Sequence, residues 1–123
     1  ALMRQVLDAG ELGYLRRITS AFTIPAAALR PDDLRYRREL GGGSLLDLGW
    51  YCVAAALWAT GTSPCRVWGT GRYVDNVDRT FSGVLWFPND VMASFDCGFE
   101  SSMRKWLEIS GTAGSLVCDD FTR

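Results

Sequence analysis

The segment that most limits how this chain can fold is residues 39–61, in which three glycines are followed by an almost unbroken apolar run. Between Glu39 and Arg66, Asp47 is the only residue whose side chain is charged at neutral pH. Apolar residues lie on all sides of a helical wheel drawn through this run, which predicts a helix that is buried rather than half exposed. We expect the rest of the chain to form a sheet around that helix.

Asp47 and Tyr51 are the candidate catalytic residues of this helix. They are four residues apart, so on an α-helix they lie on one face and can address the same small volume. Gly49 lies between them and removes side-chain bulk, at a helix cost of about 1 kcal/mol relative to alanine. The pattern therefore predicts that another group approaches the helix closely at this point.

A purely structural interpretation of the same residues stays open. Ser44 follows the glycines and is a candidate N-cap, with Asp47 at the third helical position, which is the capping-box spacing. In that case Asp47 completes the cap and Tyr51 is an ordinary core residue. Both interpretations fit the pattern.

A charged segment, residues 26–40, precedes the helix. It contains a proline, two aspartates and four arginines, which predicts a loop with one helical turn at most. Because it lies directly before the helix, it can bring Arg35, Arg37 or Arg38 to the mouth of a site. The alternative for each arginine is a solvated surface charge.

Beyond Gly61 the hydrophobic period changes from 3.6 residues to two, which predicts β-strands. The strands are separated by short turns, and such turns predict an antiparallel meander. A helix is expected over the first ten residues, ending at Gly10. The expected strands are residues 14–24, 66–74, 80–87, 91–99, 104–111 and 115–118.

The sequence thus predicts an α+β fold with an open-faced, largely antiparallel sheet and helices packed on one face, in a single domain over residues 1–123. Both sheet faces contain apolar residues, so the face without helices is expected to be an oligomer interface. We assign Val67, Val84, Trp86, Met92, Phe95, Leu107 and Ile109 to the helix-covered face, and Trp68, Phe81, Leu85 and Trp106 to the open face.

Composition narrows the classes of function. A net charge of −1, from 13 basic and 14 acidic residues, predicts no partnership with nucleic acid or a membrane. Histidine is absent and the four cysteines lack paired spacing, so no metal site is expected. Cys52, Cys65, Cys97 and Cys118 are interpreted as reduced core thiols, which favours a cytoplasmic protein.

A family resemblance runs through nearly the whole chain. GELGYLRRI, DDLRYRREL, GGGSLLDLGWY, FSGVLWFPNDVMASF and LEISGTAGSLV occur in that order. Together they resemble the C-terminal domain of the glucose-fructose oxidoreductase, inositol dehydrogenase and MocA family, and the helix motif is itself fairly specific. A helix already under way at Ala1 also predicts that this chain was cut from a longer one.

The resemblance implies one domain of an NAD(P)-dependent oxidoreductase that transfers a hydride between nicotinamide and a sugar, polyol or diol. It implies Tyr51 as the acid or base at the substrate oxygen, Asp47 as the partner of a neighbouring hydroxyl, and Arg35 as a substrate-binding residue. NAD or NADP would be bound mainly by an N-terminal Rossmann domain, whose glycine-rich loop and lysine are not in this chain. The fragment is therefore expected to contribute no cofactor-binding residue and to be inactive alone.

Two other functions stay open. A non-catalytic relative would keep the fold for assembly or ligand binding, and its sign would be loss of Asp47 and Tyr51, which are both present. An unrelated α+β binding domain would be expressed at close to this length, without a Rossmann domain before it.

Overall fold

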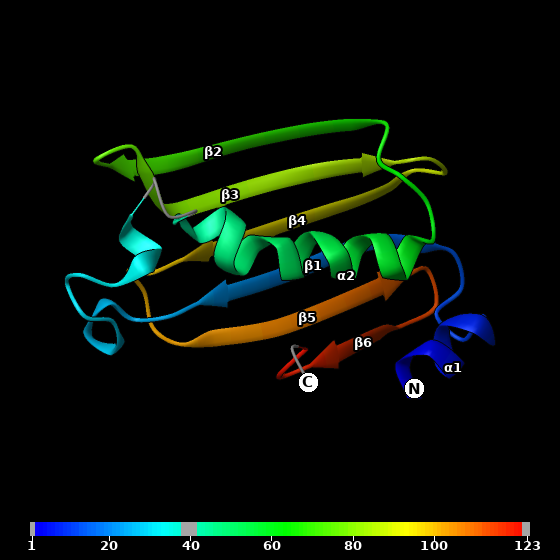
Figure 1. Ribbon diagram of the computed structural model, residues 1–123. Helices are drawn as coiled ribbons and strands as arrows, with labels where there is room; N and C mark the ends of the chain where they lie inside the picture. The colour runs from blue at the N-terminus through cyan, green and yellow to red at the C-terminus, as the bar shows by residue number, and fades with distance from the viewer. Residues whose placement is uncertain (1, 38–41, 122–123) are drawn as a thin grey trace.

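The computed structural model describes residues 2–37 and 42–121, which form a six-stranded sheet with helices on one face (Figure 1). The predicted α+β class with an open-faced, largely antiparallel sheet is confirmed. The observed strands agree closely with the predicted ranges. They are β1 (Leu15–Thr23), β2 (Arg66–Val74), β3 (Val77–Phe87), β4 (Val91–Gly98), β5 (Arg104–Gly111) and β6 (Ser115–Cys118).

The strand order β2-β3-β4-β1-β5-β6 corrects the predicted meander, because β1 lies between β4 and β5. β1 pairs with β4 in parallel, and the other neighbouring pairs are antiparallel. The Ile24 backbone N–H donates to the Gly98 carbonyl at 2.9 Å, and Thr23 Oγ1 donates to the Ser102 carbonyl at 2.6 Å. These bonds hold the β4–β5 connection across the end of β1. Hydrophobic period predicts strands but not which strands lie side by side. The position of β1 between β4 and β5 therefore has no local signal in the sequence.

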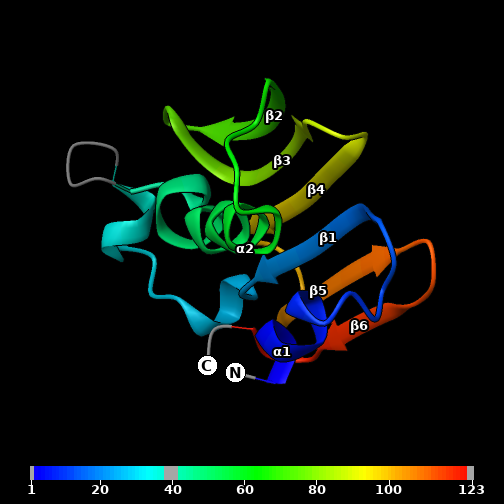
Figure 2. The same ribbon diagram turned by 90° about the vertical axis from the view of Figure 1, so that its right-hand side faces the viewer.

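The long helical segment lies across the middle of the sheet (Figures 1 and 2). It opens with a π-helical turn, Leu45–Gly49, and continues as α2, Trp50–Thr60. The shorter α1, Leu2–Asp8, lies near the β5–β6 hairpin. The segment predicted as a loop contains two short 3₁₀ turns, Ala26–Ala28 and Leu34–Tyr36.

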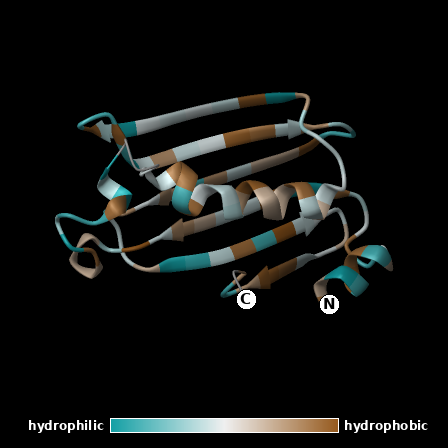
Figure 3. Cartoon of the chain, in the orientation of Figure 1, coloured by the Kyte–Doolittle hydropathy of each residue, from teal (hydrophilic) through white to brown (hydrophobic). Residues whose placement is uncertain are grey.

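Only one side of α2 is buried, which corrects the predicted burial on all sides. Cys52, Ala56 and Ala59 face the sheet, whereas Trp50 is 52% exposed and Trp58 is 40% exposed. The reason is geometric, because a single sheet covers only one side of a helix. Figure 3 shows a hydrophilic band near the start of this helical segment, which is otherwise pale to brown.

The core between α2 and the sheet corrects part of the predicted face assignment. Leu85 and Phe81 face the helix, whereas Val84, Trp86 and Met92 lie on the open face. The sequence from residue 84 to 87 is apolar at every position, so it carries no alternation, and only pairing with neighbouring strands fixes the face. The assignments confirmed are Val67, Phe95, Leu107 and Ile109 on the helix-covered face and Trp68 and Trp106 on the open face.

The open face is mixed rather than wholly apolar. Trp68, Trp86 and Trp106 share it with an ion pair in which Arg104 donates two hydrogen bonds to Asp96, at 2.7 and 2.9 Å. The oligomer interface predicted for this face stays a prediction.

The cysteines are free, but only two of them are buried in the core. Burial raises the pKa of Cys52 to about 11 and that of Cys97 to about 12. Cys65, just before the edge strand β2, is exposed, and Cys118 is half buried, which corrects the expectation of four core thiols. Among the described residues, no helix is long and apolar enough to cross a membrane.

Candidate functional site

The structure brings two of the three predicted site residues into direct contact. Arg35, in the 3₁₀ turn before the glycines, donates from Nε to Asp47 Oδ2 at 2.5 Å. The hydrogen bond to Asp47 raises the pKa of Arg35, and Asp33, 3.4 Å from Nη1, adds to this effect. The side chains of Arg35 and Asp47 are 37% and 32% exposed. The pair is therefore ordered by mutual contact but still open to a bound molecule.

The cap of the helix does not come from Ser44, which corrects the capping-box interpretation. The Ser44 backbone is already helical, with φ −69° and ψ −34°, and its side chain makes no cap hydrogen bond. Asp78 of β3 supplies the cap instead. Its Oδ2 accepts from the Leu45 backbone N–H at 2.7 Å and from the Ser44 hydroxyl at 2.9 Å. The side chain of Asp47 is thereby left to Arg35.

Backbone hydrogen bonds from Gly42 and Gly43 join the start of the helix to the segment that carries Arg35. The Gly43 backbone N–H donates to the Arg35 carbonyl at 2.8 Å, and the Gly42 N–H donates to the Arg37 carbonyl at 2.8 Å. Gly43 has a φ of +118°, and a side chain there would overlap the Asp78 carboxylate. The third glycine, Gly41, and the candidate Arg38 lie outside the described residues.

The group that approaches Gly49 is part of the sheet. A Cβ at Gly49 would lie 3.0 Å from Cys97 Sγ of β4 and 2.9 Å from a methyl carbon of Leu45. The missing side chain therefore allows the helix to lie close to the sheet. The close approach predicted at Gly49 is therefore confirmed, and the approaching group is Cys97.

Tyr51 lies on the partly exposed side of α2. Its ring is 36% exposed and stacks on Trp50 at a centroid distance of 4.1 Å. It lines a cavity of about 450 Å³, and Asp47 is not among the lining residues, which also include Leu2, Met3, Ala54, Ala55, Trp58, Leu107, Cys118 and Phe121. The shared helix face predicted for Asp47 and Tyr51 stays a prediction.

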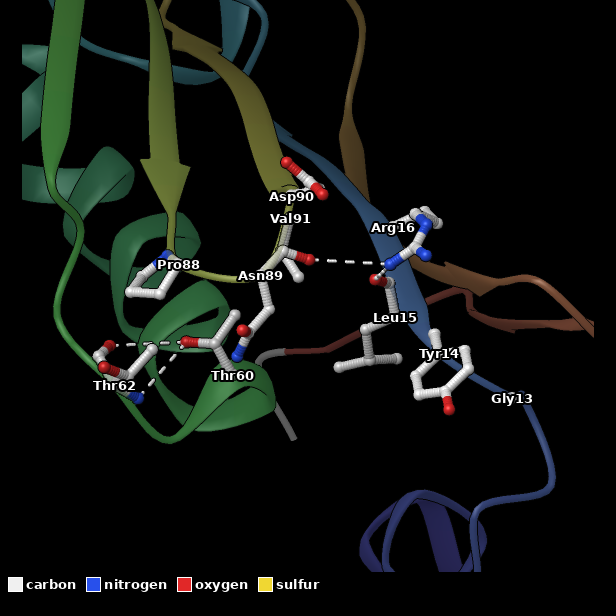
Figure 4. Close-up of a pocket in the computed structure, with 10 residues that line it drawn as sticks. All are labelled: Gly13, Tyr14, Leu15, Arg16, Thr60, Thr62, Pro88, Asn89, Asp90 and Val91. Atoms are coloured by element: carbon white, nitrogen blue, oxygen red, sulfur yellow. Dashed lines mark hydrogen bonds between the residues drawn. The ribbon is translucent and has the colours of Figure 1, made fainter.

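A separate cleft of about 630 Å³ lies beside the C-terminal end of α2 (Figure 4). Figure 4 shows Arg16 donating to the backbone carbonyl of Asn89 across one side of it, and the two atoms are 3.5 Å apart. Thr60 and Thr62 line the other side. None of the predicted site residues lines this cleft, and the length of the helix separates it from Asp47.

Comparison with known proteins decides the family. The sequence profile of the GFO/IDH/MocA C-terminal domain matches residues 1–117. The chain belongs to this family. The resemblance proposed from the sequence motifs is therefore confirmed.

Relatives of this GFO/IDH/MocA domain are oxidoreductases. A dTDP-3,4-didehydro-2,6-dideoxy-alpha-D-glucose 3-reductase of Saccharopolyspora spinosa is 36% identical over 96% of this chain and 36% of its own length. A trans-1,2-dihydrobenzene-1,2-diol dehydrogenase of Sus scrofa is 35% identical over 91% of this chain and 33% of its own. The structure of a 3-ketoreductase from Actinomadura kijaniata with NADP and TDP-benzene matches with a TM-score of 0.79 and 30% identity, over 94% of this chain and 36% of that one. The chain spans about a third of the length of these relatives.

Two carboxylates of this GFO/IDH/MocA domain were missed by the sequence analysis. Asp33 accepts a hydrogen bond from the Arg35 backbone N–H at 3.0 Å, and its spacing of two residues from that arginine was a usable signal. Asp78 had no such signal, because it is more than thirty residues from the helix it caps. The catalytic roles of Asp47 and Tyr51 and the substrate role of Arg35 stay predictions.

Proposed function

We propose that this chain is the C-terminal, substrate-binding domain of an NAD(P)-dependent oxidoreductase. The reaction proposed is transfer of a hydride between a nicotinamide and the hydroxyl-bearing carbon of a sugar, polyol or diol. The observation that carries the proposal is the family match over residues 1–117, together with Asp47 and Tyr51 at the expected positions of the helix. The chemistry named for the relatives, which includes a sugar ketoreductase and a diol dehydrogenase, supports this substrate class.

The start of the long helix does not fit the cofactor phosphates. The start of the helix, where a phosphate would otherwise bind, already donates its Leu45 N–H and its Ser44 hydroxyl to the carboxylate of Asp78. A second anion would be repelled there. This favours the expectation that NAD or NADP is held by a separate nucleotide-binding domain. The bound cofactor would supply the hydride chemistry.

Asp47 is proposed to bind one hydroxyl of the substrate. Its Oδ2 accepts from Arg35, which leaves Oδ1 with capacity to accept from a sugar or diol hydroxyl. Arg35 keeps the carboxylate in place and presents its remaining N–H groups to the same solvent-open region. Such fixed contacts orient a substrate so that its reacting carbon is held in one position.

Tyr51 is proposed to exchange the proton of the reacting oxygen. Its phenol lies on the partly exposed side of α2, within reach of a molecule in the adjacent cavity. A free phenol titrates near pH 10, so this role requires a positive charge nearby in the assembled protein. Asp47 and Tyr51 would then hold different parts of one substrate molecule that extends along the helix.

The proposal is tested with Tyr51→Phe in the full-length protein that contains this domain. We expect turnover to fall by about 10²-fold or more, because general acid-base groups contribute effects of that size. Tyr73→Phe, at an exposed tyrosine of β2, is the matched control and should retain parental turnover. The assay follows nicotinamide absorbance with NAD and NADP, against D-glucose, D-xylose, glycerol and trans-1,2-dihydrobenzene-1,2-diol. Turnover of Tyr51→Phe within a few-fold of the parent would reject the assignment.

An assembly or ligand-binding role without catalysis is the second candidate. It is favoured by the tryptophans of the open sheet face, of which Trp68 is 56% exposed, and we propose this face as the contact between copies in a homo-oligomer. Sedimentation of full-length protein with Trp68→Arg tests this contact, and dissociation into smaller species is expected. We also propose a cytoplasmic location, supported by the four free thiols.

A further inference from the structure

β3 contains one residue more than its partner strand near the β2–β3 turn. Arg72 lies opposite Thr80 and Tyr73 lies opposite Asp78, so Arg79 has no opposite residue on β2. A β-bulge of this kind interrupts the alternation of side chains and re-aims them. Regular alternation from Thr80 would place Asp78 on the open face of the sheet, but its hydrogen bonds show it on the helix side.

Asp78 fixes the start of the segment that carries Asp47. Its carboxylate accepts from the Leu45 backbone N–H at 2.7 Å and from the buried Ser44 hydroxyl at 2.9 Å. A carboxylate at this end of a helix also interacts favourably with the helix dipole. Gly43, whose side chain would overlap Asp78, permits the approach. Figure 1 shows the β2–β3 turn and the start of the helical segment at the same end of the sheet.

Arg79 fixes the segment that carries Arg35. Its guanidinium carbon lies 4.5 Å from the ring centroid of Tyr36, the residue after Arg35 in the same 3₁₀ turn. Tyr36 also makes a T-shaped contact with Phe99, at a centroid distance of 5.8 Å. The backbone carbonyl of Arg79 accepts from the Phe99 N–H at 2.8 Å, so the bulge and both rings form one connected unit.

We propose that Asp78 and Arg79 are positioning residues for the Arg35–Asp47 pair. The bulge directs the successive side chains of Asp78 and Arg79 to two separate segments. One segment carries Asp47 and the other carries Arg35. The catalytic consequence rests on the proposed function, whereas the positioning itself is a property of the domain and can be measured without substrate.

Hydrogen exchange measures the positioning directly. In full-length Asp78→Ala we expect amides of residues 43–49 to exchange about tenfold faster, the effect of losing a hydrogen bond to a charged acceptor. Amides of β1 and β5 should keep their parental rates. Asp78→Asn retains an acceptor for Leu45 N–H and should stay within about threefold of the parent. Equal exchange in the alanine and asparagine variants, or faster exchange throughout the sheet, would overturn the proposal.

Kinetics separate positioning from general stability. With the four substrates named above, we expect Asp78→Ala and Arg79→Ala to lower kcat about tenfold, since small displacements of reacting groups have effects of this order. Arg72→Ala removes an exposed ion pair to Glu100 in the β4–β5 connection and should keep parental kcat. In an Asp47→Asn background, Asp78→Ala should cause no further loss of kcat, because both changes act on one group. If the two substitutions lowered kcat by independent factors that multiply in the double variant, the assignment would be rejected.

A failure of the proposed function can be distinguished from a failure of the positioning proposal. If Tyr51→Phe and Asp47→Asn keep parental turnover while exchange at residues 43–49 responds to Asp78→Ala, the proposed function fails and the positioning stands. If those two variants lose turnover but Asp78→Ala changes neither exchange nor kcat, only the positioning fails. Should Asp78→Ala not fold, Ser44→Ala removes one of the two hydrogen bonds, and about threefold faster local exchange is expected.

Discussion

The two halves of the helical segment are held in different ways. The C-terminal half, α2, packs small buried side chains against apolar strands. The N-terminal half, the π-helical turn, also buries Leu48 in the core, and it adds directional polar contacts from Arg35 and Asp78. The buried residues of α2 are Cys52, Ala56 and Ala59.

This difference separates the contacts that stabilise the fold from those that fix the position of the Asp47 carboxylate. Burial of apolar surface is non-directional and supplies most of the favourable free energy of folding. Hydrogen bonds and partly exposed ion pairs contribute little net stability, but they fix where a carboxylate lies. Substitutions under α2 should therefore change the free energy of unfolding, whereas substitution of Asp47 in the π-helical turn should mainly change activity.

The largest expected effect is in the core under α2. Ile109 is fully buried, and Ile109→Ala should lower the free energy of unfolding by about 2–5 kcal/mol through lost transfer energy and a residual cavity. The KM of the folded enzyme should not change. Val117→Ala, at a position 64% exposed on the edge strand, is the control and should have an effect within about 0.5 kcal/mol. Urea titration gives both values, and similar losses at the two sites would contradict the comparison.

The next effect concerns activity at the π-helical turn. Asp47→Asn should lower kcat/KM by about ten- to a hundredfold, because a neutral amide orients a hydroxyl and holds Arg35 less strongly. The free energy of unfolding should change by less than about 1 kcal/mol, since the ion pair is partly exposed. Asp75→Asn, in the β2–β3 turn, removes the same charge nearby and should leave kinetics unchanged. A large decrease in the free energy of unfolding with little change in kcat/KM would show that Asp47 contributes to stability, as the core residues do.

The two ends of the helical segment can be compared with two glycines. Gly43→Ala should cost about 2 kcal/mol of unfolding free energy, because φ is +118° and the new methyl group overlaps Asp78. Gly61→Ala meets no atom within 4 Å, so it reports only the cost of its left-handed conformation, about 1 kcal/mol. Denaturant titration of both variants measures the difference. Equal costs would mean that the contact with Asp78 is easily relieved.

The smallest effect is a pH dependence from the buried thiol of α2. Burial raises the pKa of Cys52 to about 11 from an ordinary value of 9.0, so the unfolded thiol releases its proton at lower pH than the folded one. This stabilising contribution is complete below pH 9 and is lost as pH rises toward 11, by about 1 kcal/mol at pH 10. Unfolding titrations at pH 8 and 10, with reductant, should show a smaller decrease for Cys52→Ala than for the parent. Identical decreases would show that the thiol does not contribute.

The sequence alone determined the elements, the fold class and the family. The bounds of β2, β5 and β6 match the predicted ranges, because alternation and turn residues are local signals. The candidate residues Asp47, Tyr51 and Arg35 also came from the sequence, through a motif that is contiguous or nearly so.

Only the tertiary structure decided the strand order, the exposed side of α2 and the cap by Asp78. It also paired Arg35 with Asp47 and placed Tyr51 at the edge of a cavity. The physical reason is common to all of these features. Each depends on which distant segments come into contact, and a hydrophobic period records that a residue is buried without recording what it is buried against.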